Sequence, residues 1–261
     1  MGHLNLDLVL AAAVGVLIFT GLWRGMSRTS APLLARLTIW LALAAVWTGW
    51  LVGVRNLALA GAFKFELYVP GGPRIIPTQL AVVVPPLAAL VVCLAFSRWV
   101  GPFLDALPAS WLIGIQAFRV FGGSFIVGWA HGTVPAVFAW EAGSLDVAVG
   151  ALALPVAWAV SKGTPRSRSV AVAWNWLGLV DFGIALVIST LQRRAPELMG
   201  VGDPSRVRLG SYPLVLIPAF AVANAFIAHG LSLWQLRRQR QRSSASRTKV
   251  NAADFRSLTI F

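Results

Sequence analysis

The chain has 261 residues and a formal net charge of +13; 57% of its residues are hydrophobic and only 12% are charged. This composition excludes an ordinary soluble domain and is typical of a multi-spanning membrane protein. The basic residues gather in short links between apolar runs and near the C-terminus. Membrane topology and contact with anionic lipid therefore explain the positive charge, and we expect no nucleic-acid partner.

Seven apolar runs are long enough, or nearly so, to cross a hydrocarbon layer of about 30 Å, which takes roughly 17–25 helical residues. The runs are 5–23, 37–54, 78–98, 111–130, 143–160, 170–191 and 213–234. They predict an all-α fold, a polytopic membrane protein with seven transmembrane helices over residues 1–235. Residues 236–261 are basic and poor in apolar side chains, which predicts a disordered cytoplasmic tail or one held against anionic lipid.

The distribution of Lys and Arg predicts the orientation of these spans. The first, third and fifth links together with the tail hold 14 basic residues, whereas the other side holds 7. Because basic residues are retained in the cytoplasm, the N-terminus is expected outside and the C-terminus inside.

Two links between spans carry patterns of their own. Residues 63–68 alternate apolar and polar side chains before the turn at 70–73, which predicts a small outer β-hairpin between the second and third spans. The link 131–142 is too short to cross the membrane and too apolar to float free. We expect it to lie along the outer interface as a short helix or re-entrant turn.

Arg119 lies near the middle of the run 111–130, where an arginine facing lipid would cost from about 2.5 to over 10 kcal/mol. It is therefore expected to face a polar interior. Counting residues from the predicted boundaries groups the other intramembrane polar side chains into layers. Gln116, Asn175 and His229 lie five or six residues from the cytoplasmic ends of their spans, and Arg119, Asp181 and Asn224 lie about one turn or more deeper.

A buried arginine needs a counter-charge, and two aspartates are candidates. Asp181 is the better match in depth to Arg119, and Asp146 is the second candidate. Gln116 shares a helix face with Arg119 because the two residues are three apart. Such a group has two interpretations: a structural ion pair that locks helices together, or a binding and charge-compensating centre.

The cysteine and histidine content argues against a metal or other cofactor. Cys93 is the only cysteine, so neither an intrachain disulfide nor a cysteine-based metal site is available. The three histidines show no His-x-x-x-His or Glu-x-x-His spacing. No serine lies in a Gly-x-Ser-x-Gly turn, so no catalytic residue is assigned.

Several segments of residues 107–237 resemble a widespread group of uncharacterised bacterial integral membrane proteins: PASWLIGIQAFRVFGGSFIVGW, GTVPAVFAWEAGSLDVAVGALALPVAW, AWNWLGLVDF, YPLVLIPAFAV and AHGLSLWQL. The elements that carry the resemblance are Gln116, Arg119, Pro135, Phe138, Ala139, Ala142, Gly143, Asp146, Trp174, Asn175, Gly178, Asp181, Pro218 and His229. Glu141, Ser144 and Leu145 depart from the pattern before Asp146. The resemblance implies a multi-pass protein of the bacterial inner membrane and carries no activity.

The polar centre favours transport or binding of a small solute, coupled to an ion or proton. Arg119 would bind an anion or compensate charge, with Asp146 or Asp181 as its partner. His229 is a candidate for proton exchange because imidazole titrates near neutral pH. The alternatives are a non-catalytic membrane scaffold or accessory subunit, and an intramembrane enzyme that modifies lipid. The expected partners are the bilayer, anionic lipid at the tail, and a small solute or proton, while the oligomeric state stays open.

Overall fold

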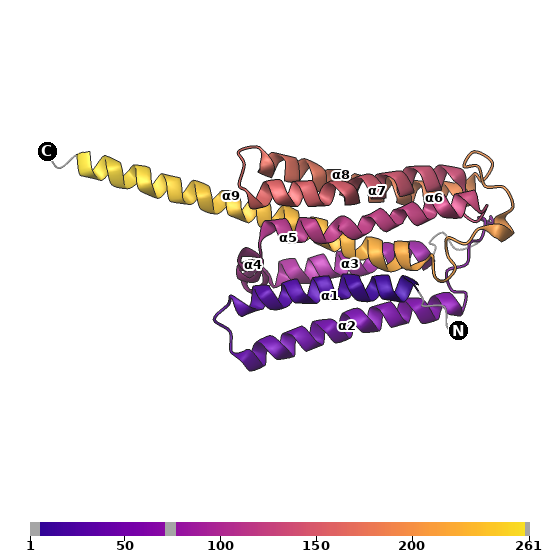
Figure 1. The fold of residues 1–261 in the computed structure, drawn as a ribbon, viewed down its shortest axis with the longest axis horizontal. Coiled ribbons are helices and arrows are strands. Elements are labelled where there is room, and N and C mark those ends of the chain that lie inside the picture. Colours follow the sequence, from indigo (N-terminus) through magenta and orange to yellow (C-terminus); the bar gives the residue numbers. More distant parts are fainter. Residues whose placement is uncertain (1–5, 71–76, 259–261) are drawn as a thin grey trace.

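The computed structural model describes residues 6–70 and 77–258, and every regular element in these ranges is helical (Figure 1). The α-helices are α1 (Leu6–Ser27), α2 (Leu33–Leu59), α3 (Pro77–Ala95), α4 (Ser97–Ala106), α5 (Ala109–Gly114), α6 (Gly123–Ala130), α7 (Ala136–Ser161), α8 (Ser167–Arg194) and α9 (Ala223–Leu258). The other elements are two 3₁₀ segments, η1 (Ile115–Gly122) and η2 (Pro204–Arg206), and a π-helical segment, η3 (Ile217–Val222).

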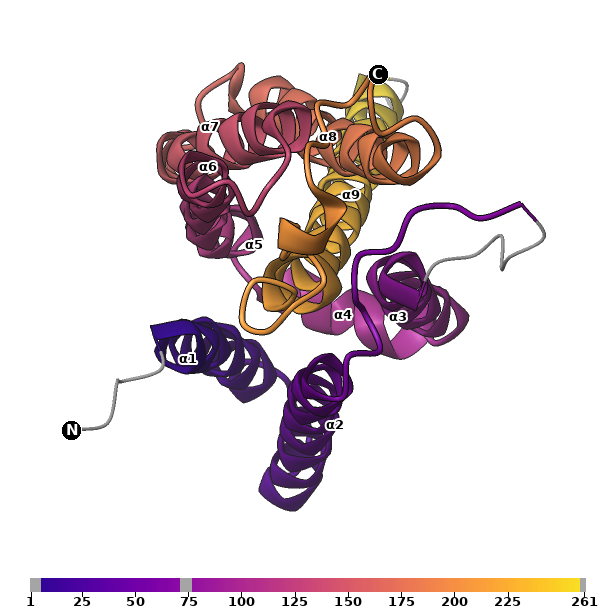
Figure 2. The same ribbon diagram turned by 90° about the vertical axis from the view of Figure 1, so that its right-hand side faces the viewer.

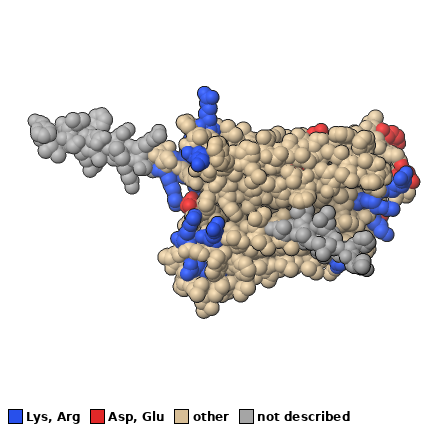
Figure 3. Space-filling view, in the orientation of Figure 1, with Lys and Arg blue, Asp and Glu red and all other residues tan. Residues whose placement is uncertain are grey.

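Six helical stretches of the described chain are long and apolar enough to cross a membrane: Leu33–Leu59, Pro77–Ala95, Ala109–Ala130, Ala136–Ser161, Ser167–Arg194 and Ile217–Ser244. In α1 the apolar stretch Val14–Ser27 is shorter than the six spans and does not reach the length set for them. The long helices run side by side, and on the face shown in Figure 3 Lys and Arg gather at the two ends of a broad, almost uncharged band. The protein is therefore an all-helical, multi-pass membrane protein with six candidate spans, and the predicted seventh is not established.

The predicted β-hairpin finds no support. Residues 63–70 contain no strand, and the second arm of the hairpin lies outside the described residues. The alternating side chains serve tertiary packing instead: Phe63 is buried against α2 and η3, and Phe65 packs beside the guanidinium of Arg193 on α8.

The predicted single helix over 111–130 is divided into α5, η1 and α6. A 3₁₀ helix has three residues per turn, so side chains three apart form a straight row. In η1 that row is Gln116, Arg119 and Gly122, the three buried residues of the segment. The tighter winding aims Gln116 and Arg119 in one direction, and the Gly122-Gly123 pair, a weak helix former, allows the change of geometry.

The expectation that 131–142 lies along the interface is wrong for its second half. Helix α7 begins at Ala136, directly after Pro135, whose fixed φ suits a helix start. Phe138, Ala139 and Ala142 are buried in the core. The apolar character of this segment therefore reflects packing inside the protein.

The segment predicted as a tail from residue 236 onward is helical in the structure, because α9 continues without a break through Leu258. Neither Gly nor Pro occurs between 231 and 258, and Arg, Gln, Lys and Ala are good helix formers. The low apolar content that suggested disorder describes a helix that leaves the bundle, as Figure 1 shows.

Helix α7 is central to the bundle: it packs on α5, η1 and α6 along one side and on α8 along the other. Helix α9 closes the group by contacting α8, α3 and α5. Viewed end-on in Figure 2, α1 and α2 stand outside this group, and only Val54 and Ala58 of α2 are buried. The polar side chains therefore meet inside the group formed by α5 to α9.

Candidate functional site

The guanidinium of Arg119 is buried and contacts two carboxylates and one imidazole. Its Nε donates to Oδ1 of Asp146 at 2.7 Å, and its Nη2 lies 2.7 Å from the same oxygen. Nη2 also donates to Oδ2 of Asp181, and Nη1 lies 2.9 Å from Nε2 of His229. Both candidate aspartates thus pair with Arg119, each from a different helix.

This centre holds one guanidinium and two carboxylates, all nearly inaccessible: Arg119 is 3% exposed, Asp146 5% and Asp181 2%. With both aspartates ionised, the charges of the three side chains sum to −1. Oδ1 of Asp181 is buried and makes no hydrogen bond within the described part of the chain. A buried charge without compensation costs several kcal/mol. The site is therefore suited to take up one more positive charge.

The hydrogen bonds of His229 define its tautomer. Arginine can only donate, so Nε2 of His229 has to accept from Arg119 and carries no proton. The other ring nitrogen, Nδ1, lies 2.9 Å from Oδ1 of Asn175 and donates to it. The amide of Asn175 is oriented in turn, since its Nδ2 donates to the Ala171 carbonyl at 2.8 Å and to Ser232 Oγ at 3.1 Å. His229 is therefore neutral, with its proton on Nδ1.

Gln116 completes this layer beside the imidazole. Its Nε2 lies 3.4 Å from Nδ1 of His229 and 3.4 Å from the Leu112 carbonyl, while its Oε1 is buried without a partner in the described residues. Gln116, Asn175 and His229 thus lie together, as their predicted depths suggested.

Ser232 and Phe182 also belong to the centre. Ser232 accepts a hydrogen bond from Asn175, and the Phe182 ring centroid lies 4.2 Å from the Arg119 guanidinium carbon. Sequence reasoning missed both, because an isolated serine or phenylalanine in an apolar helix carries no distinguishing signal.

Asn224 does not join the cluster. Its Oδ1 accepts a hydrogen bond from Nε1 of Trp47 at 3.0 Å, and its Nδ2 donates to the Phe220 carbonyl at 2.8 Å. Depth alone grouped Asn224 with Arg119, but five α-helical residues separate Asn224 from His229 by about 140° around the axis. Asn224 therefore faces α2 while His229 faces the centre.

Two glycines make the close approach of these helices possible. A Cβ on Gly178 would overlap the His229 ring and lie 2.8 Å from Nη1 of Arg119. A Cβ on Gly150 of α7 would lie 2.6 Å from the backbone nitrogen of Val120 in η1. Small residues are the usual means of close helix packing in membranes. Here they allow α7, α8 and α9 to approach η1 closely enough for their side chains to contact the Arg119 guanidinium.

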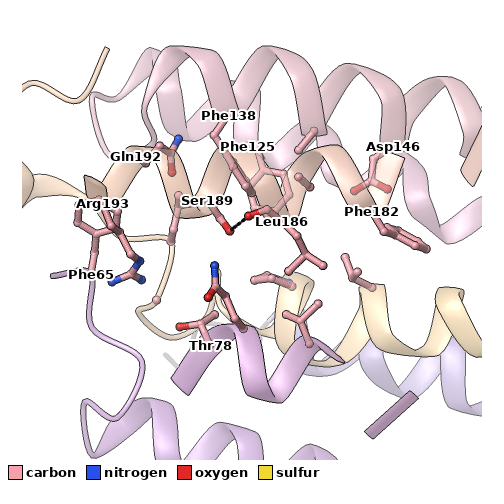
Figure 4. A pocket seen from close by; sticks show the side chains of 18 of the residues that line it. Phe65, Thr78, Phe125, Phe138, Asp146, Phe182, Leu186, Ser189, Gln192 and Arg193 are labelled. Carbon is pink, nitrogen blue, oxygen red and sulfur yellow. Dashed lines mark hydrogen bonds between the residues drawn. The ribbon is translucent and has the colours of Figure 1, made fainter. Parts of the chain in front are cut away.

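A narrow cavity of about 80 Å³, called here the α8 cavity, runs from the centre towards the end of the bundle where the loops after α2 and α8 lie, called here the loop end (Figure 4). Asp146, Asp181 and Phe182 line its inner end, and Phe65 and Arg193 line its mouth. Its walls come from α3, α6, α7, α8 and η3 and include Thr78, Gln79, Phe125, Phe138, Ser189 and Gln192.

A larger cavity of about 270 Å³, called here the α1 cavity, reaches the centre from another side. It lies between α1, η1, η3 and the start of α9, and its lining is mostly apolar and aromatic, with Arg119, Ser124, Asp146 and Asn224 as the polar residues. Asp146, Phe182 and Val222 line both cavities. The π-helical segment η3 therefore stands between two spaces that meet at the ion-pair centre.

No group of three or more His, Cys, Asp or Glu side chains within the described residues is arranged to hold a metal ion. The groups that converge are instead a cation, two acids, an imidazole and amides. This set can hold and exchange protons and can fix a charged partner.

Fold and site together define a multi-pass helical membrane protein with a buried, asymmetric ion-pair centre. The chain belongs to the family described as Domain of unknown function (DUF8737), whose model matches residues 75–237. The matched segment contains Arg119, Asp146, Asp181 and His229, and it begins further towards the N-terminus than the resemblance over 107–237. Neither curated proteins nor solved structures gave a match.

Proposed function

We propose that this chain is a bacterial inner-membrane protein that binds or transports a small solute in a proton-coupled manner, with Asp181 as the proton-binding group. The observation that carries the proposal is the arrangement of charge: two buried carboxylates share one guanidinium, and Oδ1 of Asp181 faces a cavity without a partner among the described residues. A proton on Asp181 would bring the centre to neutrality. Loss of that proton would leave a buried negative charge, which favours a change of conformation or uptake of a cation.

The contacts of Arg119 favour charge compensation over anion binding. Its Nε, Nη1 and Nη2 groups all donate to side chains of the protein. An anionic solute would have to displace a carboxylate and would meet a second one close by. The proposed role of Arg119 is therefore to hold Asp146 and Asp181 together, while the proton is the species exchanged.

The α1 cavity is the proposed solute site. It has room for a small organic molecule, its wall is mainly apolar, and a few polar groups lie at its inner end, as is usual for ligand pockets. Asp146 lines this cavity and accepts two hydrogen-bonding contacts from Arg119. A solute there would contact the same ion pair whose charge depends on Asp181, and this contact provides the coupling.

The proposed topology keeps seven spans, with α1 as the first, the N-terminus outside and the C-terminus inside. The excess of basic residues on the side of the tail supports this orientation. The extension of α9 carries the exposed residues Arg237 and Arg240, for which anionic headgroups are the proposed partners. Such contacts contribute about 1 kcal/mol per basic residue near the surface.

A scaffold function is the second candidate, because the same contacts tie η1, α7, α8 and α9 together. The two functions differ in whether the centre changes its protonation state. The test is a rapid pH jump on reconstituted protein adsorbed to a solid-supported membrane, which records charge movement on proton binding.

Wild-type protein is expected to give a transient current that is absent in Asp181→Asn and retained in Glu197→Gln, which amidates an exposed carboxylate outside the ion pair. Infrared difference spectra between acid and alkaline pH should show the carbonyl stretch of a protonated carboxyl group, lost in the same variant. A correctly folded wild-type protein with neither signal would reject the proton-coupled function and leave the scaffold.

A further inference from the structure

We propose that the α8 cavity holds a single file of hydrogen-bonded water that connects Asp181 with the loop end of the bundle, the outer side in the proposed topology. This inference rests on the proposed function for the role of Asp181 as proton acceptor. The cavity would then be the path by which protons reach the centre from outside. Its occupant is water, and the species that moves along it is the proton.

Polar atoms without partners are concentrated along this cavity. Among the buried side-chain atoms that make no hydrogen bond within the described residues are Oγ1 of Thr78, Oδ1 of Asp181, and both Nε2 and Oε1 of Gln192. All three residues line the α8 cavity. Gln192 is 0% exposed. Buried polar groups of folded proteins are nearly always satisfied by protein or by ordered water, so these four atoms require water in the cavity.

The dimensions of the cavity fit a file of water. Asp181 and Gln192 are eleven residues apart on α8, which corresponds to about 16 Å along the helix axis and about three turns, so both face the same side. About six waters spaced roughly 2.8 Å apart cover that length. A volume of about 80 Å³ admits a similar number, roughly five to eight, at 10–15 Å³ per water. The length and the volume therefore agree on one row of molecules.

The walls favour water over an organic ligand. Phe125, Phe138 and Phe182 narrow the space from different helices, and the polar atoms occur at intervals along it. Figure 4 shows Gln192, Arg193 and Phe65 at one end, Asp146 and Phe182 at the other, and Thr78 across from Ser189 between them. Ser189 donates to the Leu186 carbonyl at 2.9 Å, which leaves its oxygen able to accept from water. Polar groups at both ends of the cavity and midway along it can hydrogen-bond to a row of water molecules that passes protons.

The titratable groups near the path come from η1, α7, α8 and α9. At the inner end Arg119 (η1) and Asp146 (α7) contact or adjoin Asp181, and neutral His229 (α9) lies behind the guanidinium. Glu141 on α7 adds a more distant negative charge. At the mouth Arg193 stacks on Phe65 and donates to the Glu66 carbonyl at 3.0 Å. Helix α3 contributes only neutral polar groups, Thr78 and Gln79, to the lining.

The proton transfer along this file is balanced at each step. A hydronium at the mouth passes a proton to the next water, and each water forms one new O–H bond and gives up another. The last water donates to Oδ1 of Asp181, where an O–H bond forms and the carboxylate becomes a neutral acid. Oδ2 keeps its hydrogen bond from Arg119, so the ion pair with Asp146 remains in place.

The presence of water can be tested without any transport signal. In full-length protein with Cys93→Ala, the variants Ser189→Cys and Val187→Cys place a thiol at nearly equal depth on α8, one lining the cavity and one exposed on the apolar surface. Ag⁺ added from the loop side should bind the thiol of Ser189→Cys and protect it against later alkylation under denaturing conditions. The thiol of Val187→Cys should stay unprotected. Equal protection at both positions, or none at 189, would overturn the water-filled path.

The use of the path by protons is tested by Gln192→Leu in the pH-jump experiment. Loss of the Gln192 amide, which would hydrogen-bond to the water file, is expected to slow the current roughly tenfold without changing the total charge moved. Gln192→Ser keeps a hydrogen-bonding group and should recover part of the rate. An unchanged rate in Gln192→Leu would refute the path. If the wild type gives no current while Ag⁺ protection at 189 holds, the cavity is hydrated and the proposed function is what fails.

Discussion

Gly178 on α8 faces the His229 imidazole so closely that a Cβ at residue 178 would overlap Nε2 and Cε1 of the ring. The same Cβ would lie 2.8 Å from Nη1 of Arg119. The absence of a side chain at this position is therefore part of the ion-pair centre. It allows α8 to deliver Asp181, one turn further on, to the guanidinium.

Gly178→Ala is expected to destabilise the protein by about 1–3 kcal/mol, the usual cost of overfilling a packed interior, because the ring or the guanidinium has to move. Gly183 on the same helix is a matched control, since a Cβ there meets nothing within 4 Å. Gly183→Ala should be neutral or slightly stabilising, because alanine is the better helix former. Unfolding in detergent measures both, and equal effects would mean that position 178 is not sterically constrained.

Arg119→Gln should destabilise the protein by about 3–5 kcal/mol, as expected when one partner of a buried ion pair is removed. The loss arises because Asp146 and Asp181 would remain buried without their cation. The triple variant Arg119→Gln, Asp146→Asn, Asp181→Asn removes every charge at similar volume and should recover most of the stability. A triple variant that is no more stable than Arg119→Gln would show that the cost comes from packing and not from charge.

The two aspartates should respond unequally to amidation. Asp146 accepts from both Nε and Nη2 of Arg119 through Oδ1, whereas Asp181 accepts one hydrogen bond at Oδ2 and has no partner for Oδ1 among the described residues. Asn resembles a protonated Asp, so Asp181→Asn should cost less than about 1 kcal/mol, and Asp146→Asn about 1.5–3 kcal/mol. Equilibrium unfolding of the two variants compares them directly, and the reverse order would assign the exchangeable proton to Asp146.

The sequence was informative about the centre because a charge inside an apolar run is physically costly. That cost singled out Arg119 and required carboxylates at matching depth, and the structure places Asp146, Asp181, His229, Gln116 and Asn175 around it. Helices long enough to span a membrane were equally visible, since length and hydropathy are local properties.

What the sequence did not disclose depends on direction around a helix and on tertiary contacts. The common face of Gln116 and Arg119 was predicted, but the 3₁₀ winding of η1, which adds Gly122 to the same row, was not, because residues three apart also share a face of an α-helix. Depth counting could not tell that Asn224 turns towards Trp47. The complete burial of Gln192 was not predicted either, because a glutamine near a helix end looks like an ordinary surface residue.

Trp47→Phe should loosen α2 from the bundle. It removes the Nε1–H group that donates to Asn224, leaving the amide oxygen without its donor at a cost of about 1–3 kcal/mol. Trp50 packs on the same Phe220 ring, at 5.0 Å between centroids, so Trp50→Phe serves as control. Hydrogen exchange in α2 should rise in the first variant only. Similar exchange in both would indicate that the aromatic contacts, and not the hydrogen bond, hold α2.

Asp105→Asn should release α4 from the extension of α9. Asp105 accepts from Nε and Nη2 of Arg238 at 3.2 and 2.7 Å, and Arg242 lies 2.6 Å from its Oδ2. Both arginines are partly solvated, so the expected loss is small, about 1 kcal/mol or less. Hydrogen exchange of α4 should increase, and its sensitivity to salt should disappear because the ion pairs are gone. Arg237→Gln, which changes an exposed neighbour, is the matched control. Should α4 exchange equally in both variants, its position depends instead on the hydrogen bonds from Gln235 to the Leu104 and Leu107 carbonyls.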